Sequence, residues 1–213
     1  MPYRKIPFVN GEIYHIYNRG VAKLPIFSEK RDYDRFLSTI YYYSYQDPKP
    51  QFSQVKRFKD FQIEENPQII EILCYCLMPN HYHFLIRQLE DGGVPEFISK
   101  FTNSYTKYFN IKHDRVGSLL QGQFKAVRME TTEQLIHVSR YIHLNPTTSF
   151  LVKDIEKHMW SSYPNFIGLN EDDICNKKFI LSLFKSPEDY RQFVLDQQNY
   201  AQELHKIKHL ILE

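Results

Sequence analysis

The chain has 213 residues, of which 42% are hydrophobic and 15% aromatic, and its formal net charge is +2. This length and composition predict one ordinary globular core and exclude a disordered chain. The small net charge neither requires nor excludes a polyanionic partner. Three cysteines without a CxxC spacing indicate a reducing compartment. No apolar stretch predicts a signal peptide or a membrane span, so we expect a cytoplasmic protein without a membrane partner.

The N-terminal part predicts a strand, a helix and an insertion. Residues 11–18 are β-rich and end in turn chemistry, which predicts the first strand. Apolar residues recur at helical spacing over residues 29–45, with Ser28 as the expected N-cap. The segment of about residues 46–68 is polar and rich in proline, so we interpret it as an insertion without an assigned role.

The central part predicts a hairpin, a helix and a fourth strand. Residues 69–77 and 81–88 are β-rich and are separated by Met78-Pro79-Asn80, which favours an antiparallel hairpin. Residues 94–109 read as the second helix and residues 123–130 as the fourth strand.

A third helix opens at Thr131, which is spaced from Gln134 as in a capping box, and Pro146 is expected to end it. A last helix is expected over residues 187–212. The order β-α-β-β-α-β predicts a ferredoxin-like or RRM-like α+β fold, an antiparallel sheet with helices on one face and the other face free to bind. We expect one main domain at residues 1–165 and a helical extension at 166–213.

The hairpin carries a possible metal half-site. In a strand, His81 and His83 point to the same face with their α-carbons about 6.5 Å apart, close enough for both imidazoles to bind one cation. The alternative is a pair of solvated or hydrogen-bonded histidines.

The third helix adds two polar side chains on one stripe. Tyr141 and Asn145 are four residues apart and therefore point the same way. An amide oxygen can join two imidazoles around a divalent cation. A phenol is a possible nucleophile, but its free pKa of about 10 means that it needs activation. Considered alone, Tyr141 is one of 16 tyrosines and is better explained as a packing residue.

Several short motifs follow one another in a fixed order. They are Tyr14-His15-Ile16-Tyr17-Asn18-Arg19-Gly20, Ile26-Phe27, Met78-Pro79-Asn80-His81-Tyr82-His83, Tyr108-Phe109-Asn110 and Arg140-Tyr141-Ile142-His143-Leu144-Asn145-Pro146. This series resembles the motifs of the single-tyrosine HUH transposases, the IS200-like family, and in particular its REP-associated tyrosine transposase branch. Two departures are Leu120 in place of a common Trp and Gln123 in place of a common Arg.

The resemblance implies a metal-dependent DNA transposase. His81 and His83 would bind Mg²⁺ or Mn²⁺, and Asn145 stands where related enzymes carry a polar helix ligand. Tyr141 would attack a phosphodiester of single-stranded or hairpin DNA and form a 5′-phosphotyrosine. The expected protein is nucleoid-associated and either a monomer or a homodimer.

Basic and polar residues predict where DNA would lie. A band of cations between the second helix and the fourth strand could follow a phosphate backbone, and Asn18, Arg19 and Gln121 lie in matched motifs. The cations of this basic band are Lys107, Lys112, Arg115, Lys125 and Arg128. The alternative is a solvated helix face, and His15 remains open between a core residue and a site neighbour. A non-catalytic nucleic-acid module with an RRM-like sheet is the alternative function.

Overall fold

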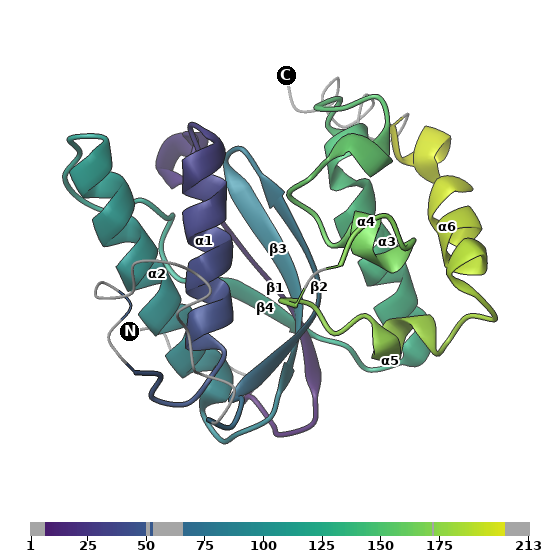
Figure 1. Cartoon of the computed structure of the whole chain (residues 1–213), viewed down its shortest axis with the longest axis horizontal. Helices are drawn as coiled ribbons and strands as arrows, with labels where there is room; N and C mark the ends of the chain where they lie inside the picture. The colour runs from purple at the N-terminus through teal and green to yellow at the C-terminus, as the bar shows by residue number, and fades with distance from the viewer. Residues whose placement is uncertain (1–6, 50–51, 53–65, 172, 203–213) are drawn as a thin grey trace.

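The computed structural model describes residues 7–49, 52, 66–171 and 173–202. Its centre is a four-stranded antiparallel sheet with strand order β2-β3-β1-β4 (Figure 1). The strands are β1 (Ile13–Arg19), β2 (Ile70–Met78), β3 (His81–Gln88) and β4 (Lys125–Arg128). The predicted α+β class, its β-α-β-β-α-β order and the antiparallel sheet are therefore confirmed.

Two helices cover one face of the sheet, α1 (Lys30–Tyr43) and α2 (Gly93–Lys112) (Figure 1). The strand period of two sends Tyr82 and Phe84 to this face, where the ring of Phe36 on α1 lies 5.5 Å and 6.2 Å from theirs. Phe101 on α2 contacts the same ring at 5.3 Å. Burial of these aromatic side chains is the main term that holds both helices on the sheet.

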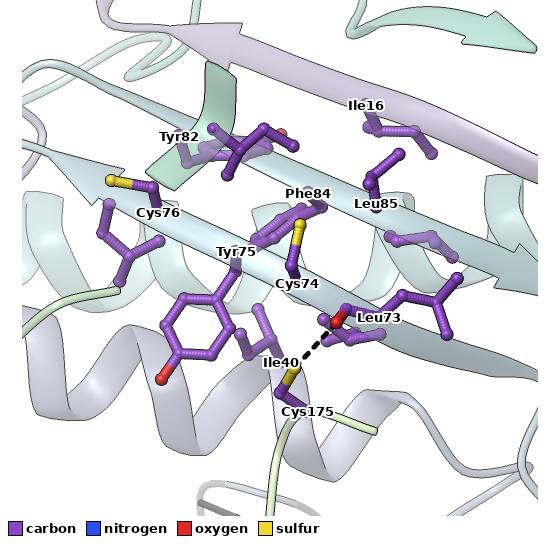
Figure 2. Close-up of a cluster of buried hydrophobic side chains, with 14 of the residues drawn as sticks. Ile16, Ile40, Leu73, Cys74, Tyr75, Cys76, Tyr82, Phe84, Leu85 and Cys175 are labelled. Atoms are coloured by element: carbon purple, nitrogen blue, oxygen red, sulfur yellow. Dashed lines mark hydrogen bonds between the residues drawn. The ribbon is translucent and has the colours of Figure 1, made fainter. Parts of the chain in front are cut away.

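The third helix, α3 (Thr132–Thr148), lies on the opposite face, next to β2 (Figure 1). The two helices of the β-α-β-β-α-β unit share one face as predicted, whereas α3, which follows the unit, covers part of the face that was expected to be free. The cause is visible in β2, whose side chains are buried on both sides and whose sequence is an almost continuous apolar run. Figure 2 shows Cys74, Tyr75 and Cys76 of this strand, with Cys175 bonded through its Sγ to the Leu73 carbonyl at 2.9 Å. The free face is thus only the part over β1, β3 and β4.

The remaining elements are short. They are the 3-10 turns η1 (Val21–Lys23) and η4 (Ile155–Lys157) and the helices α4 (Tyr163–Phe166), α5 (Lys178–Leu181) and α6 (Pro187–Leu195). Ile180, Tyr190 and Val194 belong to the same buried core as the sheet. The division into domains at residue 165 stays a prediction. Within the described part of the chain, no helix is long and apolar enough to cross a bilayer.

Several predicted boundaries were wrong. The N-cap of α1 is Glu29, which forms a reciprocal capping box with Asp32, whereas the amide of Ser28 donates to the Asp32 carboxylate at 2.9 Å. Pro146 does not end α3, because the amide of Ser149 bonds back to the Asn145 carbonyl at 3.0 Å and closes the last turn beyond the proline.

Other differences are in length. Thr131 is the N-cap of α3 as predicted, but the side chain of Gln134 accepts from the amide of Glu130 and not from that of Thr131. The strand β4 is shorter than residues 123–130, and α6 ends at Leu195. Most of the predicted insertion at about residues 46–68, and the end of the predicted last helix, lie outside the described residues.

Candidate active site and nucleic-acid interface

The histidine pair lies at the start of β3 on the face opposite α1 and α2. The rings of His81 and His83 are perpendicular, with centroids 5.1 Å apart. The side-chain oxygen of Asn80 is 2.7 Å from Nδ1 of His81, and its amide nitrogen donates to the Lys23 carbonyl at 3.0 Å. Since that second bond fixes the orientation of the amide, Nδ1 of His81 carries the hydrogen. The lone pair of His81 is then on Nε2.

His15 is a neighbour of this pair and not only a core residue. Its Nε2 lies 2.9 Å from Nδ1 of His83, and both side chains are buried. Burial lowers the pKa of His15 and of His81 to about 4, and that of His83 well below its usual range. All three rings are therefore neutral at pH 7, the form in which an imidazole binds a metal ion. His83 is only 5% exposed, whereas His81 is partly exposed.

Tyr141 and Asn145 come to the same place from α3. The ring of Tyr141 stands edge-on to His83 at 5.5 Å and to His15 at 6.1 Å. The Asn145 side chain lies within hydrogen-bonding reach of both the His81 ring and the Tyr141 hydroxyl. Asn145 also donates to the backbone carbonyl of Tyr141 at 2.9 Å, which ties its side chain to the turn that carries the phenol.

The phenol of Tyr141 is protonated at neutral pH. Burial raises its pKa, and the hydrogen bond from Asn145 lowers it by a smaller amount. The side chain is nevertheless 52% exposed, so a ligand can reach it. A nucleophilic role would therefore need a group that accepts the phenolic proton or stabilises the phenolate.

These side chains line a pocket of about 490 Å³ between α3, the sheet and two loops. Its described lining contains three cations and no carboxylate, which favours a polyanionic ligand. The lining residues are Tyr17, Asn18, Arg19, Lys23, Asn80, His81, His83, Gln121, Gln123, Lys125 and Tyr141.

Four of the residues predicted to contact DNA are at this pocket. Nε of Arg19 donates to the Gln121 side chain at 2.6 Å, and the amide of Gln121 donates to the Arg19 carbonyl at 2.8 Å. Asn18 accepts from the amide of Arg19 at 2.8 Å, and Lys125 stands opposite Tyr17 at the start of β4. The strand end and the loop before β4 are thereby joined into one polar rim.

The other four predicted DNA contacts are not brought to the pocket. Lys112 is bound to the buried carboxylate of Asp32 at 2.6 Å and to Glu29, and Lys107 is exposed on α2 behind the sheet. Arg128 pairs with Glu12 at 2.8 Å, and the guanidinium of Arg115 lies 5.7 Å from the centroid of the Phe109 ring. The basic band of the sequence is thus divided between two faces of the sheet.

Four pocket residues were not predicted from the sequence as part of the site. Tyr17 shares its strand face with His15 and Arg19, so the strand period alone could have indicated it. Asn80 directly precedes His81, and Gln123 was noted only as a departure from a common Arg. Lys23 comes from the turn η1, and no local pattern pointed to it.

The donor groups suit a divalent cation that completes its shell with oxygen. Among the described residues, no group of three or more His, Cys, Asp or Glu is arranged to hold a metal ion. Two neutral imidazoles with Nε2 of His81 free, together with the amide oxygen of Asn145, still form a three-donor set, and water or phosphate oxygens could fill the remaining positions. The residues present therefore fit such a cation.

This chain is similar to known proteins in its sequence motifs and in its fold. The model of a family described as "Transposase IS200 like" matches residues 54–145, a range that includes His81, His83, Tyr141 and Asn145. A solved structure described as "Structure of the REP associates tyrosine transposase bound to a REP hairpin" is similar over 83% of this chain and 98% of that chain. Its TM-score is 0.53 and its sequence identity 13%, so this likeness shows the fold. No curated protein matches. The family match supports the predicted resemblance to the IS200-like transposases over residues 54–145.

Proposed function

We propose that this protein is a DNA strand transferase of the REP-associated branch, which cleaves single-stranded DNA through a covalent 5′-phosphotyrosine at Tyr141. The observation that carries the proposal is the meeting of one phenol, two neutral imidazoles and one amide in a positively charged pocket. A family of DNA transposases provides the reaction class.

The step assigned to Tyr141 is a phosphoryl exchange. The phenolic oxygen forms a bond to phosphorus, the bond from phosphorus to the 3′ oxygen breaks, and the phenolic proton ends on the released 3′-hydroxyl. The phosphoester is kept, so the reverse reaction with a new 3′-hydroxyl completes strand transfer. The contact of Asn145 with the Tyr141 hydroxyl orients the phenol and favours its ionised form.

His81, His83 and Asn145 would hold Mg²⁺ or Mn²⁺. Such an ion supplies charge neutralisation at the phosphate when it is bound. The protein's own part is to keep the ligands neutral and oriented, which burial and the bonds to Asn80 and His15 provide.

Single-stranded DNA, probed as a hairpin with a single-stranded flank, is the proposed substrate. Arg19, Lys23 and Lys125 would contact its phosphates, and the half-exposed Tyr141 would meet a backbone that is not held in a duplex. The solved neighbour was bound to a REP hairpin, which supports the hairpin as the first probe. The protein would act on it in the nucleoid, as a monomer or a homodimer.

The test is a covalent-adduct assay with matched tyrosine variants. A labelled DNA hairpin with a single-stranded flank is incubated with Mn²⁺, and a protein-DNA band that survives denaturation is expected. Tyr141→Phe should abolish the band, whereas Tyr17→Phe, which removes the other phenol of the pocket, should still form it.

The assay also separates the alternatives. Tyr105 and Tyr108 lie on α2 and bond to the Ile26 carbonyl and to Asp32, so their phenylalanine variants are distant controls. Loss of the adduct in Tyr17→Phe but not in Tyr141→Phe would assign the nucleophile to β1. Tight DNA binding without any adduct in the wild type would instead support the non-catalytic RRM-like module.

A further inference from the structure

Two residues beside Tyr141 turn away from the pocket and contact the C-terminal helix. Arg140 precedes Tyr141 and His143 follows it by two positions, and both belong to the motif that resembles the family. The guanidinium of Arg140 lies 4.2 Å from the centroid of the Phe193 ring on α6 and donates to the Phe193 carbonyl at 3.3 Å. The turn that carries Tyr141 is therefore attached to α6 directly.

His143 is fully buried and joins α6 to the sheet through a chain of hydrogen bonds. Nε2 of His143 lies 2.8 Å from the Ser162 hydroxyl oxygen, which lies 3.2 Å from the Tyr75 carbonyl. Nδ1 of the same ring lies 2.8 Å from the Tyr190 hydroxyl, which is also 3.2 Å from the Ser139 hydroxyl, so one ring nitrogen donates and the other accepts. The amide of Tyr75 also donates to the Ser162 oxygen, at 2.9 Å.

This chain of hydrogen bonds ends on β2, the strand beside the one that carries the histidine pair. Tyr75 is the neighbour of Cys76 in β2, and Cys76 stands opposite His83 in β3. The same set of bonds therefore fixes α3 relative to both α6 and the sheet. Apolar contacts of α3, such as those of Leu135 and Ile142, are not directional and would tolerate a small rotation, whereas buried hydrogen bonds do not.

We propose that α6 positions the nucleophile, with Tyr190 and Phe193 as positioning residues that hold α3 at the rotation where Tyr141 faces His83. At the side-chain radius of an α-helix, about 5–6 Å, a rotation of about 10° moves an atom by about 1 Å. A displacement of that size can slow a positioned reaction by about 10²-fold. This inference rests on the proposed function, because it concerns the same phenol.

The decisive comparison is between two buried tyrosines of the C-terminal part. Tyr190 and Tyr163 are both fully buried and both contact the ring of His143, at 5.8 Å and 5.4 Å. The Tyr190 hydroxyl is bonded to His143, whereas the Tyr163 hydroxyl has no partner among the described residues. Tyr190→Phe and Tyr163→Phe therefore each remove one hydroxyl from the same buried core. Only Tyr190→Phe breaks the chain of hydrogen bonds through His143.

The experiment measures the single-turnover rate of adduct formation at saturating hairpin DNA and Mn²⁺, and separately the Kd for DNA. We expect Tyr190→Phe to slow the adduct rate by tenfold or more with an unchanged Kd, and Tyr163→Phe to keep the wild-type rate. Phe193→Leu removes the ring under Arg140 and should slow the same step. All rates are taken well below each variant's melting temperature, so that a loss of stability alone does not change them.

Two outcomes would overturn the inference. A wild-type adduct rate in both Tyr190→Phe and Phe193→Leu would show that apolar packing alone sets the position of α3. An equal loss of rate in Tyr163→Phe would show a general effect on the core. A wild type that forms no adduct, or a Tyr141→Phe variant that still does, would instead overturn the proposed function.

Discussion

Replacing His15 by alanine should weaken metal binding, although it removes none of the proposed metal ligands. His15 Nε2 is 2.9 Å from Nδ1 of His83, and this bond holds the His83 ring with its other nitrogen available. Loss of such a supporting bond typically weakens metal affinity by about 10- to 100-fold. This corresponds to about 1.4–2.7 kcal/mol of binding free energy. His15→Gln, whose side-chain oxygen can accept from His83, should recover part of the loss.

The assay is a titration of the free protein with Mn²⁺, followed by calorimetry or by the electron paramagnetic resonance signal of the unbound ion. Val127→Ala is the matched control, because Val127 stands opposite His15 on β4 and contributes no polar atom. The reasoning is refuted if His15→Ala binds Mn²⁺ as tightly as the wild type, or if Val127→Ala loses as much affinity.

Three further expectations follow from the site and the core. His81→Ala should abolish both Mn²⁺ binding and cleavage with a nearly unchanged melting temperature of the metal-free protein, and cleavage at the wild-type rate would contradict the ligand assignment. Duplex DNA without a hairpin should be cut poorly, and single-strand binding should fall with salt at a logarithmic slope of about −2, since three pocket cations contribute about −0.7 each; equal cleavage of duplex would contradict it. Burial lowers the pKa of His143 to about 3 in the folded protein, from about 6.5 in the unfolded chain. As pH falls, the unfolded state therefore takes up the proton before the folded state does. The stabilising effect of His143 is complete above pH 6.5, and this residue should account for about 2 kcal/mol of the unfolding free energy that is lost between pH 7 and pH 5. His15, His81, His83 and His158, whose pKa values are also lowered by burial, add to the loss in the same direction. The carboxyl of Asp32 titrates below this window, so an unchanged urea midpoint between these pH values would oppose the assignment.

The sequence by itself determined the element order and half of the site. The strand period of two placed His81 and His83 on one face, and the helical spacing placed Tyr141 and Asn145 on one stripe. Both statements depend only on local backbone geometry, so they hold regardless of how the rest of the chain folds. The fold class followed from the order of these elements for the same reason, and the resemblance to the IS200-like transposases followed from the order of the short motifs.

The tertiary structure alone decided which side chains share a space. Lys112 and Arg128 are as basic as Lys125 in the sequence, but only Lys125 reaches the pocket, because Asp32 and Glu12 hold the other two elsewhere. Such pairing is set by residues that are 80 or more positions apart, and no local period encodes it. The end of α3 was mispredicted for a local reason, because a hydrogen bond from the amide of Ser149 to the Asn145 carbonyl continues the helix past its proline.

The face on which α3 lies was also a tertiary decision. The apolar run of β2 indicated burial, but a strand that is apolar on both sides does not tell which helix covers which side. The C-terminal helices resolve this, because Tyr190 and Ser162 bond to His143 and hold α3 against β2. Local periodicity thus predicts which chemical groups share a face of a helix or strand. The buried hydrogen bonds of His143, which join distant parts of the sequence, decide that the phenol and the imidazoles meet.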